Sequence, residues 1–365
     1  MTSSAHGLLL PGKTTSAPLA VSRRRDPSAT VVLKREGTLG IATRHRSTQS
    51  AARPRVAAAL AWTACLLVAA AFLGACSAQA TMGGVPATVV ATGLGSGGAA
   101  PAAKAAAAAD WARVLQVLAD LKATPPSEPV VVLVGGSAAR ESTISDRSWR
   151  DQIKDNGGGA TIAFNLGSRN RTLAQNIAIV QALPTVPAIV YIGLNLGAFT
   201  SAQKNATIAL PKPSASVSLQ QPHQYSKRHI LTAAKKKSLV SAWLVDRYPV
   251  FRRNYASSTG VLERLIKACL AKEGTHPVLF ELPRNAAIIG HRLDAPFARY
   301  RKACQALAKK YGIPYVSFLP KKLPNSSFYD LWHLVEPGRT VWQPLLAAKT
   351  ADLLDKYGMG AGATP

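Results

Sequence analysis

Five short apolar runs, each bounded by turn residues, constrain the fold of this chain more than any other feature. They lie at 129–134, 160–164, 187–192, 277–281 and 314–318. Apolar runs of five or six residues are typical of strands that are buried on both faces of a parallel sheet. Helical segments alternate with them, at 107–122, 140–153, 170–182, 233–245, 257–273, 295–311 and 339–356. This alternation predicts an α/β fold with a doubly wound, five-stranded parallel sheet and right-handed crossovers.

Small and polar residues follow three of these runs. Ser137 comes after the first run, Gly167 after the second and Asn195 after the third. Asp330 and His333 are three residues apart, between the fifth run and the last helix. Because sites in doubly wound sheets lie at the carboxyl ends of the strands, we expect these five residues to share one site.

The residue types in this set fit acyl chemistry at a serine. A serine hydroxyl is a weak nucleophile near neutral pH, an imidazole can take its proton, and a carboxylate can hold that imidazole in the required tautomer. We therefore interpret Ser137 as the nucleophile, His333 as the general base and Asp330 as its orienting group. The backbone N–H groups of Ser137 and Gly167 and the side chain of Asn195 would form an oxyanion hole. This chemistry requires no cofactor and no metal.

At this point the chain resembles a known family. The motif residues of the SGNH (GDSL-type) hydrolases occur over residues 128–355 in the family's order, as Ser137, Gly167, Asn195, Asp330 and His333. The resemblance implies a flavodoxin-like three-layer α/β/α sandwich and serine-based ester hydrolysis or acyl transfer. Within the family, the chain looks most like exported or membrane-anchored bacterial members that act on envelope glycans.

The chain departs from the family pattern at two positions. Gly136 precedes the serine where the family has an aspartate, and Leu196 follows Asn195 where the third block ends in a second aspartate. Neither change removes an atom that the proposed chemistry uses.

The N-terminal third differs in composition from the rest. Residues 1–55 are rich in Arg, Ser and Thr without apolar periodicity, which predicts a disordered, basic cytoplasmic tail. Residues 56–76 carry no charge and are long enough to span a bilayer as a signal anchor, with the rest of the chain outside. The alternative is a lipoprotein signal in which Cys76 is lipidated. Residues 77–105 read as a flexible linker, and 106–365 as the hydrolase-like domain.

One segment, residues 198–232, is too long for an ordinary connection and leaves directly after the Asn195 turn. We expect a lid or rim over the site, and the alternative is a mobile insertion without a role. The residues expected to recognise substrate, in this segment and next to the motifs, are Arg140, Tyr225, Lys227, Arg228 and Trp332. Arg140 could instead pair with Glu141 on the first helical turn.

Two cysteines fall within the predicted domain. Cys269 and Cys304 lie on helices that flank one strand, and outside the cytoplasm they could form a disulfide. The alternative is that both are separate small core residues. No clustered pattern of His and Cys predicts a structural metal.

Basic residues outnumber acidic ones in the domain as well as in the tail. The whole chain has a formal net charge of +26, of which residues 81–365 carry +18. Such a field attracts polyanions, through clusters such as 235–237 and 309–310. An exported domain without a recognisable nucleic-acid motif is not expected to bind nucleic acid. The expected partner is an envelope polysaccharide or another anionic polymer.

These observations predict an extracytoplasmic serine esterase or O-acyltransferase, held in the bacterial cytoplasmic membrane by a single N-terminal helix. It would act on acyl esters, acetyl first, of envelope polysaccharide, and transfer would need a membrane acyl-donor protein. The alternative is a catalytically inactive SGNH-fold protein that binds an envelope component or polyanion. Replacement of Ser137 separates the two, because a binding protein would not depend on that hydroxyl.

Overall fold

A central five-stranded sheet organises the computed structural model, which describes residues 99–361. Every strand is parallel to its neighbours, in the order β2-β1-β3-β4-β5. The strands are β1 (Val130–Val134), β2 (Ile162–Asn165), β3 (Ala188–Leu194), β4 (Thr275–Glu281) and β5 (Tyr315–Ser317). The predicted α/β class and the five-stranded parallel sheet are therefore confirmed. The strand order reverses between β1 and β3, and doubly wound sheets hold their sites at such a point.

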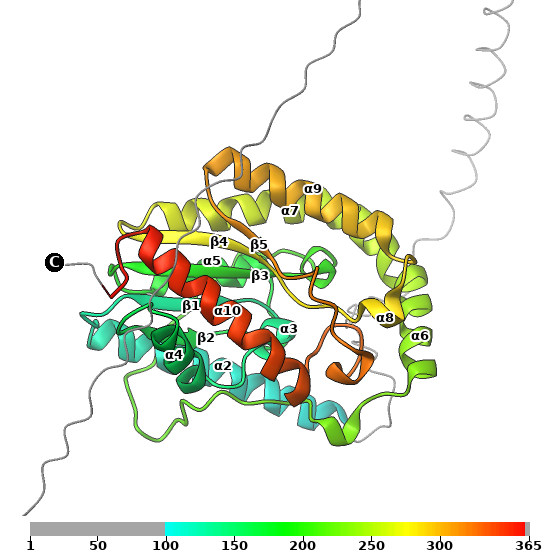
Figure 1. Cartoon of the computed structure of the whole chain (residues 1–365), viewed down its shortest axis with the longest axis horizontal. Helices are drawn as coiled ribbons and strands as arrows, with labels where there is room; N and C mark the ends of the chain where they lie inside the picture. Colours follow the sequence, from blue (N-terminus) through cyan, green and yellow to red (C-terminus); the bar gives the residue numbers. More distant parts are fainter. Residues whose placement is uncertain (1–98, 362–365) are drawn as a thin grey trace, which may run out of the picture. The chain divides into compact units, whose positions relative to one another are not determined.

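Helices cover both faces of the sheet and complete three layers (Figure 1). One layer contains α2 (Ala99–Ala123), α5 (Leu173–Ala182), α7 (Tyr248–Leu270) and α9 (Asp294–Tyr311). The other contains α4 (Asp146–Asp155) and α10 (Glu336–Lys356). The shorter elements are α3 (Ser137–Arg140), η1 (Leu196–Phe199), η2 (Lys227–His229), α6 (Ala233–Ala242), η3 (Trp243–Arg247), α8 (Ala286–Ile289) and η4 (Asn325–Ser327).

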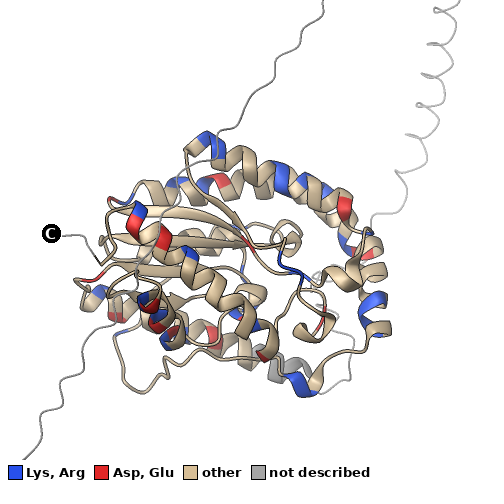
Figure 2. Ribbon diagram, viewed as in Figure 1, with Lys and Arg blue, Asp and Glu red and all other residues tan. Residues whose placement is uncertain are grey.

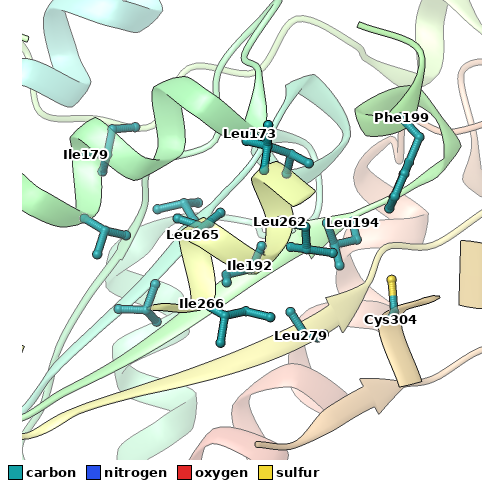
Figure 3. Close-up of a cluster of buried hydrophobic side chains, with 14 of the residues drawn as sticks. Leu173, Ile179, Ile192, Leu194, Phe199, Leu262, Leu265, Ile266, Leu279 and Cys304 are labelled. Carbon is teal, nitrogen blue, oxygen red and sulfur yellow. The ribbon is translucent and has the colours of Figure 1, made fainter. Parts of the chain in front are cut away.

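Alternate strand residues supply the two halves of the core. Val132 and Val190 pack into the half under α2, α5, α7 and α9, part of which appears in Figure 3. Val131 and Ile189 point to the other face, against α4 and α10. Because both faces are covered, the strands read as continuous apolar runs rather than as alternating ones.

The helices differ from the sequence prediction in two places. The single helix expected at 140–153 is two helices, because the Ser145 side chain accepts the Ser148 N–H and starts α4 anew. The two helices expected at 233–245 and 257–273 follow one another without a loop, because the π-helical turn η3 joins α6 directly to α7. Pro249 follows this turn at the start of α7, where its missing N–H interrupts the regular hydrogen-bond ladder.

Most of the N-terminal predictions fall outside the described residues. This holds for the tail over 1–55, for the membrane span over 56–76 with Cys76, and for most of the linker. The linker prediction was wrong at its C-terminal end, because α2 already begins at Ala99. Within 99–361, no helix combines the length and the apolar character that a bilayer crossing requires.

Candidate active site

Ser137 begins α3 directly after β1, and the two glycines before it determine how it is presented. A Cβ at Gly135 would lie 2.7 Å from the Ala139 Cβ and 3.1 Å from the Gly193 carbonyl oxygen. A larger residue would therefore push α3 away from the sheet. Gly136 is extended and precedes the first helical residue. This local sequence places the half-buried Ser137 side chain at the carboxyl end of β1.

A chain of hydrogen bonds joins Ser137, His333 and Asp330. Ser137 Oγ lies 2.8 Å from His333 Nε2, across 196 residues of sequence. His333 Nδ1 lies 2.8 Å from Asp330 Oδ2. With Nδ1–H donating to the carboxylate, Nε2 is left to accept the serine O–H, which is the arrangement that general-base activation needs.

Asp330 is fixed by its own loop as well as by the imidazole. Its Oδ1 accepts the backbone N–H groups of Trp332, at 2.8 Å, and of His333, at 2.9 Å. Burial acts to raise the pKa of the Asp330 carboxyl, but the His333 charge and these hydrogen bonds outweigh burial and lower the pKa. The group is therefore a carboxylate at neutral pH and can stabilise an imidazolium beside it.

Neighbouring elements hold the loop that carries Asp330 and His333. Lys236 of α6 is fully buried, and its Nζ donates to the Phe328 carbonyl oxygen at 2.7 Å. Asn285, after β4, donates from Nδ2 to the Asp330 carbonyl oxygen at 3.1 Å. Within the basic cluster 235–237, the Lys236 ammonium group therefore binds this loop and is not available to an external polyanion, contrary to expectation.

A cavity of about 200 Å³ opens beside Ser137. Residues that follow β1, β2 and β3 line it together with the loop before α10. They include Gly136, Ser137, Asn170, Arg171, Asn195, Trp332 and His333. The cavity is smaller than the usual pocket for a drug-sized ligand, so it suits a small acyl group better than a long chain.

Of the two further oxyanion candidates, the structure brings only Asn195 to this cavity. The Asn195 Oδ1 accepts the Ala198 N–H at 3.3 Å, so the amide presents its donor end, Nδ2, to other groups. Gly167 does not contribute as expected. Its N–H already donates to Asn165 Oδ1 at 2.9 Å, and a Cβ there would lie 2.4 Å from the Arg140 backbone nitrogen. Gly167 is needed for close packing against α3.

Asn170, three residues after Gly167, takes the place at the cavity that was expected for Gly167. It lines the cavity and has φ of 55°, the one positive φ of a non-glycine residue within 99–361. Its backbone N–H has no hydrogen-bond partner among the described residues. A left-handed residue of this kind is often found at functional sites. The sequence signal for this position is that the residue is an asparagine, which tolerates the left-handed conformation better than most residue types.

Aromatic side chains border the triad on two sides. The Tyr225 ring lies over the imidazole of His333, with centroids 4.5 Å apart, and stacks on Tyr329 at 4.3 Å. Trp332 lines the cavity from the neighbouring loop. Tyr225 therefore restricts the rotation of the His333 ring and comes from the segment predicted as a lid or rim.

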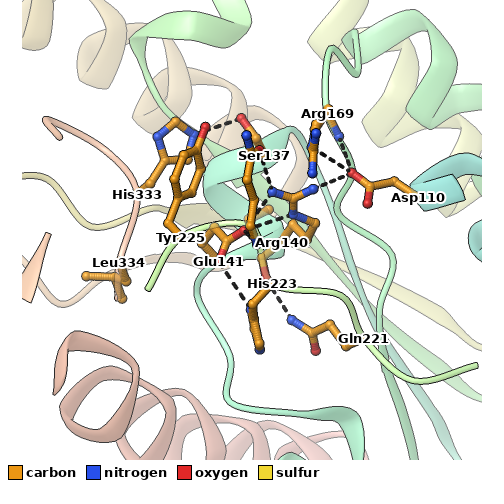
Figure 4. Close-up of polar contacts among 12 residues, drawn as sticks. Asp110, Ser137, Arg140, Glu141, Arg169, Gln221, His223, Tyr225, His333 and Leu334 are labelled. Atoms are coloured by element: carbon orange, nitrogen blue, oxygen red, sulfur yellow. Dashed lines mark hydrogen bonds and ion pairs between the residues drawn. The ribbon is translucent and has the colours of Figure 1, made fainter. Parts of the chain in front are cut away.

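Arg140 does not face the cavity, which corrects the prediction that it recognises substrate. Its side chain is 1 % exposed and pairs with Asp110 and Glu141 (Figure 4). Glu141 is itself 0 % exposed and also accepts a hydrogen bond from Arg339 Nη1 at 2.7 Å. Burial acts to raise the pKa of the Glu141 carboxyl, but hydrogen bonding to His223 and the Arg140 charge lower it. These residues form a buried ionic cluster under α3.

The segment 198–232 is fastened to this cluster. Gln221 donates from Nε2 to the Arg140 carbonyl oxygen at 2.6 Å, and the Gln224 N–H donates to Glu141 Oε1 at 3.0 Å. His223 Nδ1 lies 3.2 Å from Glu141 Oε2. The alternative of a mobile insertion therefore does not hold for 221–225. Residues 227 and 228, the predicted contacts Lys227 and Arg228, are exposed on η2 and are absent from the cavity lining.

The remaining sequence candidates concern cysteines and metals. Cys269 and Cys304 are free, buried thiols rather than a disulfide. Burial raises the pKa of Cys269 to about 12 and the pKa of Cys304 further still. Both cysteines are separate core residues, as the alternative to a disulfide predicted. No group of His, Cys, Asp and Glu within 99–361 has the arrangement of a metal site.

Comparison with known proteins adds no identification. The chain matches no model of a protein family and no curated protein.

Proposed function

We propose that this chain is a serine esterase or O-acyltransferase of the SGNH type. The observation that carries the proposal is the chain of hydrogen bonds from Ser137 to His333 and from His333 to Asp330, with 2.8 Å at each of the two contacts. Its position at the carboxyl end of β1, beside a small cavity, adds support. Chance rarely brings a hydroxyl, an imidazole and a lowered-pKa carboxylate into this sequence of hydrogen bonds at the strand switch point.

The reaction would proceed in two half-reactions through an acyl-enzyme. Ser137 Oγ attacks the ester carbonyl carbon while its proton passes to His333 Nε2. The imidazolium, stabilised by Asp330, then gives this proton to the departing alcohol oxygen as the ester bond breaks. Water or a sugar hydroxyl next loses a proton to His333 and attacks the carbonyl carbon of the acyl-enzyme. His333 then returns this proton to Ser137 Oγ as the bond between Oγ and the acyl carbon breaks, which releases either the free acid or a new ester.

The negative charge of each tetrahedral intermediate needs donors that are already in position. We assign this role to the Ser137 backbone N–H and to Asn195 Nδ2. The Asn170 backbone N–H takes the place first given to Gly167, because Asn170 lines the cavity and this N–H has no hydrogen-bond partner within 99–361. The Tyr225 ring, which packs against the imidazole, would keep His333 directed at the serine through both half-reactions.

The proposed substrate is an acyl ester, acetyl first, on an envelope polysaccharide. The net charge of +18 over residues 81–365 supports an anionic polymer as partner. Figure 2 shows Lys and Arg along α6, α7 and α9, and the pairs 252–253 and 309–310 are exposed. The proposed location is outside the cytoplasmic membrane, anchored by the N-terminal segment. In transfer, a membrane protein would supply the acyl group.

The test is hydrolysis of 4-nitrophenyl acetate by the purified full-length protein. Ser137→Ala and His333→Ala should each lower kcat/KM by at least about a thousandfold, because the triad acts as one unit. His291→Ala is the matched control. His291 also pairs with an aspartate three residues away, Asp294 at 2.8 Å, but this pair is exposed.

The outcomes separate the two functions considered. Loss of activity in both triad variants, with His291→Ala unaffected, supports the enzyme. A folded protein without esterase activity, whose Ser137 does not react with a fluorophosphonate, refutes it and favours the inactive, polyanion-binding alternative.

A further inference from the structure

Arg171 stands apart from the other buried arginines. The described residues contain four arginines that are buried, and three of them form ion pairs: Arg113 with Asp146, Arg140 with Asp110 and Glu141, and Arg339 with Glu141. Arg171 is 8 % exposed, and no carboxylate among residues 99–361 lies within ion-pairing distance of it. A buried cation without a counter-ion is costly, so its presence calls for an explanation.

The side chain is nevertheless held firmly in place. The Arg171 guanidinium carbon lies 3.5 Å from the ring centroid of Trp111 in α2. Nε donates to Ser168 Oγ at 3.0 Å, and Nη2 donates to the same oxygen. One face is thus covered by an aromatic ring and one edge by a hydroxyl, which fixes the plane of the guanidinium.

One nitrogen of the guanidinium is left without a protein partner within 99–361, and Arg171 belongs to the lining of the candidate active site. Nη1 has no hydrogen-bond partner among the described residues and is not among their fully enclosed, unpaired nitrogens. Arg171 lines the same cavity as Ser137 and His333. Burial lowers the pKa of Arg171 to about 9, with the Asp110 charge opposing that change, so the group remains a cation at neutral pH.

We propose that Arg171 binds an anionic group of the substrate, a carboxylate or a phosphate, and places the neighbouring ester bond at Ser137. A planar guanidinium is the side chain best suited to such groups, and a bound oxyanion would supply the counter-ion that residues 99–361 do not provide. This inference rests on the proposed function and narrows it to acidic esters. The anion lies in the acyl group, as in a dicarboxylic acid half-ester, or in the alcohol, as in an acidic sugar.

Three small esters distinguish these sources. They are neutral 4-nitrophenyl acetate, mono-4-nitrophenyl succinate with its carboxylate in the acyl group, and 4-acetoxybenzoate with its carboxylate in the alcohol. Arg171→Gln, which keeps donors for Ser168 but removes the charge, should lower kcat/KM for one of the two anionic esters about ten- to a hundredfold more than for the acetate. The ester so affected identifies which side of the bond carries the anion.

Controls separate this effect from a change in net charge or in folding. Arg253→Gln removes one exposed charge from α7 and should leave the ratio of anionic to neutral rates as in the wild type. Arg171→Lys keeps the charge without the planar fork and should retain part of the preference for the anionic ester over the acetate. This variant also tests the proposal if Arg171→Gln does not fold. A uniform fall in rate for all three esters would overturn the proposal.

A binding measurement separates this proposal from the proposed function. Succinate and inorganic phosphate are titrated calorimetrically into Ser137→Ala and into the Ser137→Ala, Arg171→Gln double variant. Binding of either anion that is lost in the double variant supports the anion site even if the wild type hydrolyses no ester. Triad-dependent hydrolysis without anion binding and without preference for the anionic esters leaves the esterase standing and overturns the role of Arg171.

Discussion

The buried ionic cluster under α3 predicts a large loss of stability when Glu141 is replaced by Gln. The wild-type carboxylate accepts hydrogen bonds from Arg140 Nε at 3.0 Å and Nη2 at 2.6 Å, and from Arg339 Nη1 at 2.7 Å. An amide has only one oxygen, so one of the two guanidinium groups must then face an NH₂ group. Neither arginine can reach water without unpacking its surroundings.

The size of this loss in unfolding free energy depends on the partners that Arg140 and Arg339 keep. Removing one partner from a buried ion pair costs about 3–5 kcal/mol. Arg140 retains the carboxylate of Asp110. Arg339 retains the Leu334 carbonyl oxygen at 3.0 Å and a half-exposed carboxylate, Glu336, at 3.8 Å. We therefore expect the lower end, about 3 kcal/mol of unfolding free energy. For a urea dependence of about 1–3 kcal/mol per molar, the midpoint should fall by about 1–3 M.

Urea unfolding of the full-length protein, followed by tryptophan fluorescence, measures this loss. Asp352→Asn is the matched control, since its pair with Lys349 at 3.2 Å is exposed and should contribute at most about 1 kcal/mol. The pKa of Glu141 is lowered in the folded protein, so its stabilisation is complete above the unfolded pKa of about 4.3 and is lost as pH falls through the folded value. The difference in unfolding free energy between the wild type and Glu141→Gln should therefore become smaller only in that acid range. A loss no larger than that of the control would refute the reasoning.

Three further predictions concern local geometry. Gly167→Ala should destabilise the protein by about 1–3 kcal/mol, because the new Cβ would lie 2.4 Å from a backbone nitrogen. Gly260→Ala, at a position in α7 with open space around it, should be neutral or stabilising by up to about 1 kcal/mol. Urea unfolding midpoints measure both changes in stability. Asn170→Gly should keep esterase activity, since the proposed donor is a backbone N–H, and should raise stability slightly by relieving the positive φ. The expected results are an unchanged kcat/KM and a raised urea midpoint. Lost activity would count against the role of this N–H as a donor. Cys269 and Cys304 should react with a thiol reagent only on unfolding, so rapid titration of either thiol in the native protein would contradict their burial.

Much of the framework could be predicted from the sequence, because its signals are local. Val131 and Val132 lie in an unbroken apolar run, and such runs alternate with helices often enough to predict a parallel sheet. The spacing of Asp330 and His333 predicted that both would face one point, and the structure brings them to Ser137. Residues at strand ends are therefore the part of the site for which sequence reasoning worked.

The rest depends on contacts between distant segments. Gly167 and Asn170 lie in the same turn, and only the path of that turn decides which of them borders the cavity. Arg140 is buried because α2 and α10 bring Asp110 and Arg339 next to it, and neither is close in sequence. Such pairings carry no periodic signal, so the sequence could not distinguish a buried cluster from a substrate contact.

The attachment of segment 221–225 to α3 limits how the recognition surface of this protein can be redesigned. In many enzymes a rim loop can be exchanged between homologues without disturbing the nucleophile. Here the loop contributes Tyr225 above His333, while Gln221 and Gln224 complete the polar contacts of Arg140 and Glu141. A transplanted loop would leave those buried groups unsatisfied. Altered specificity would therefore be reached by point changes on the cavity side of the loop, rather than by exchanging it whole.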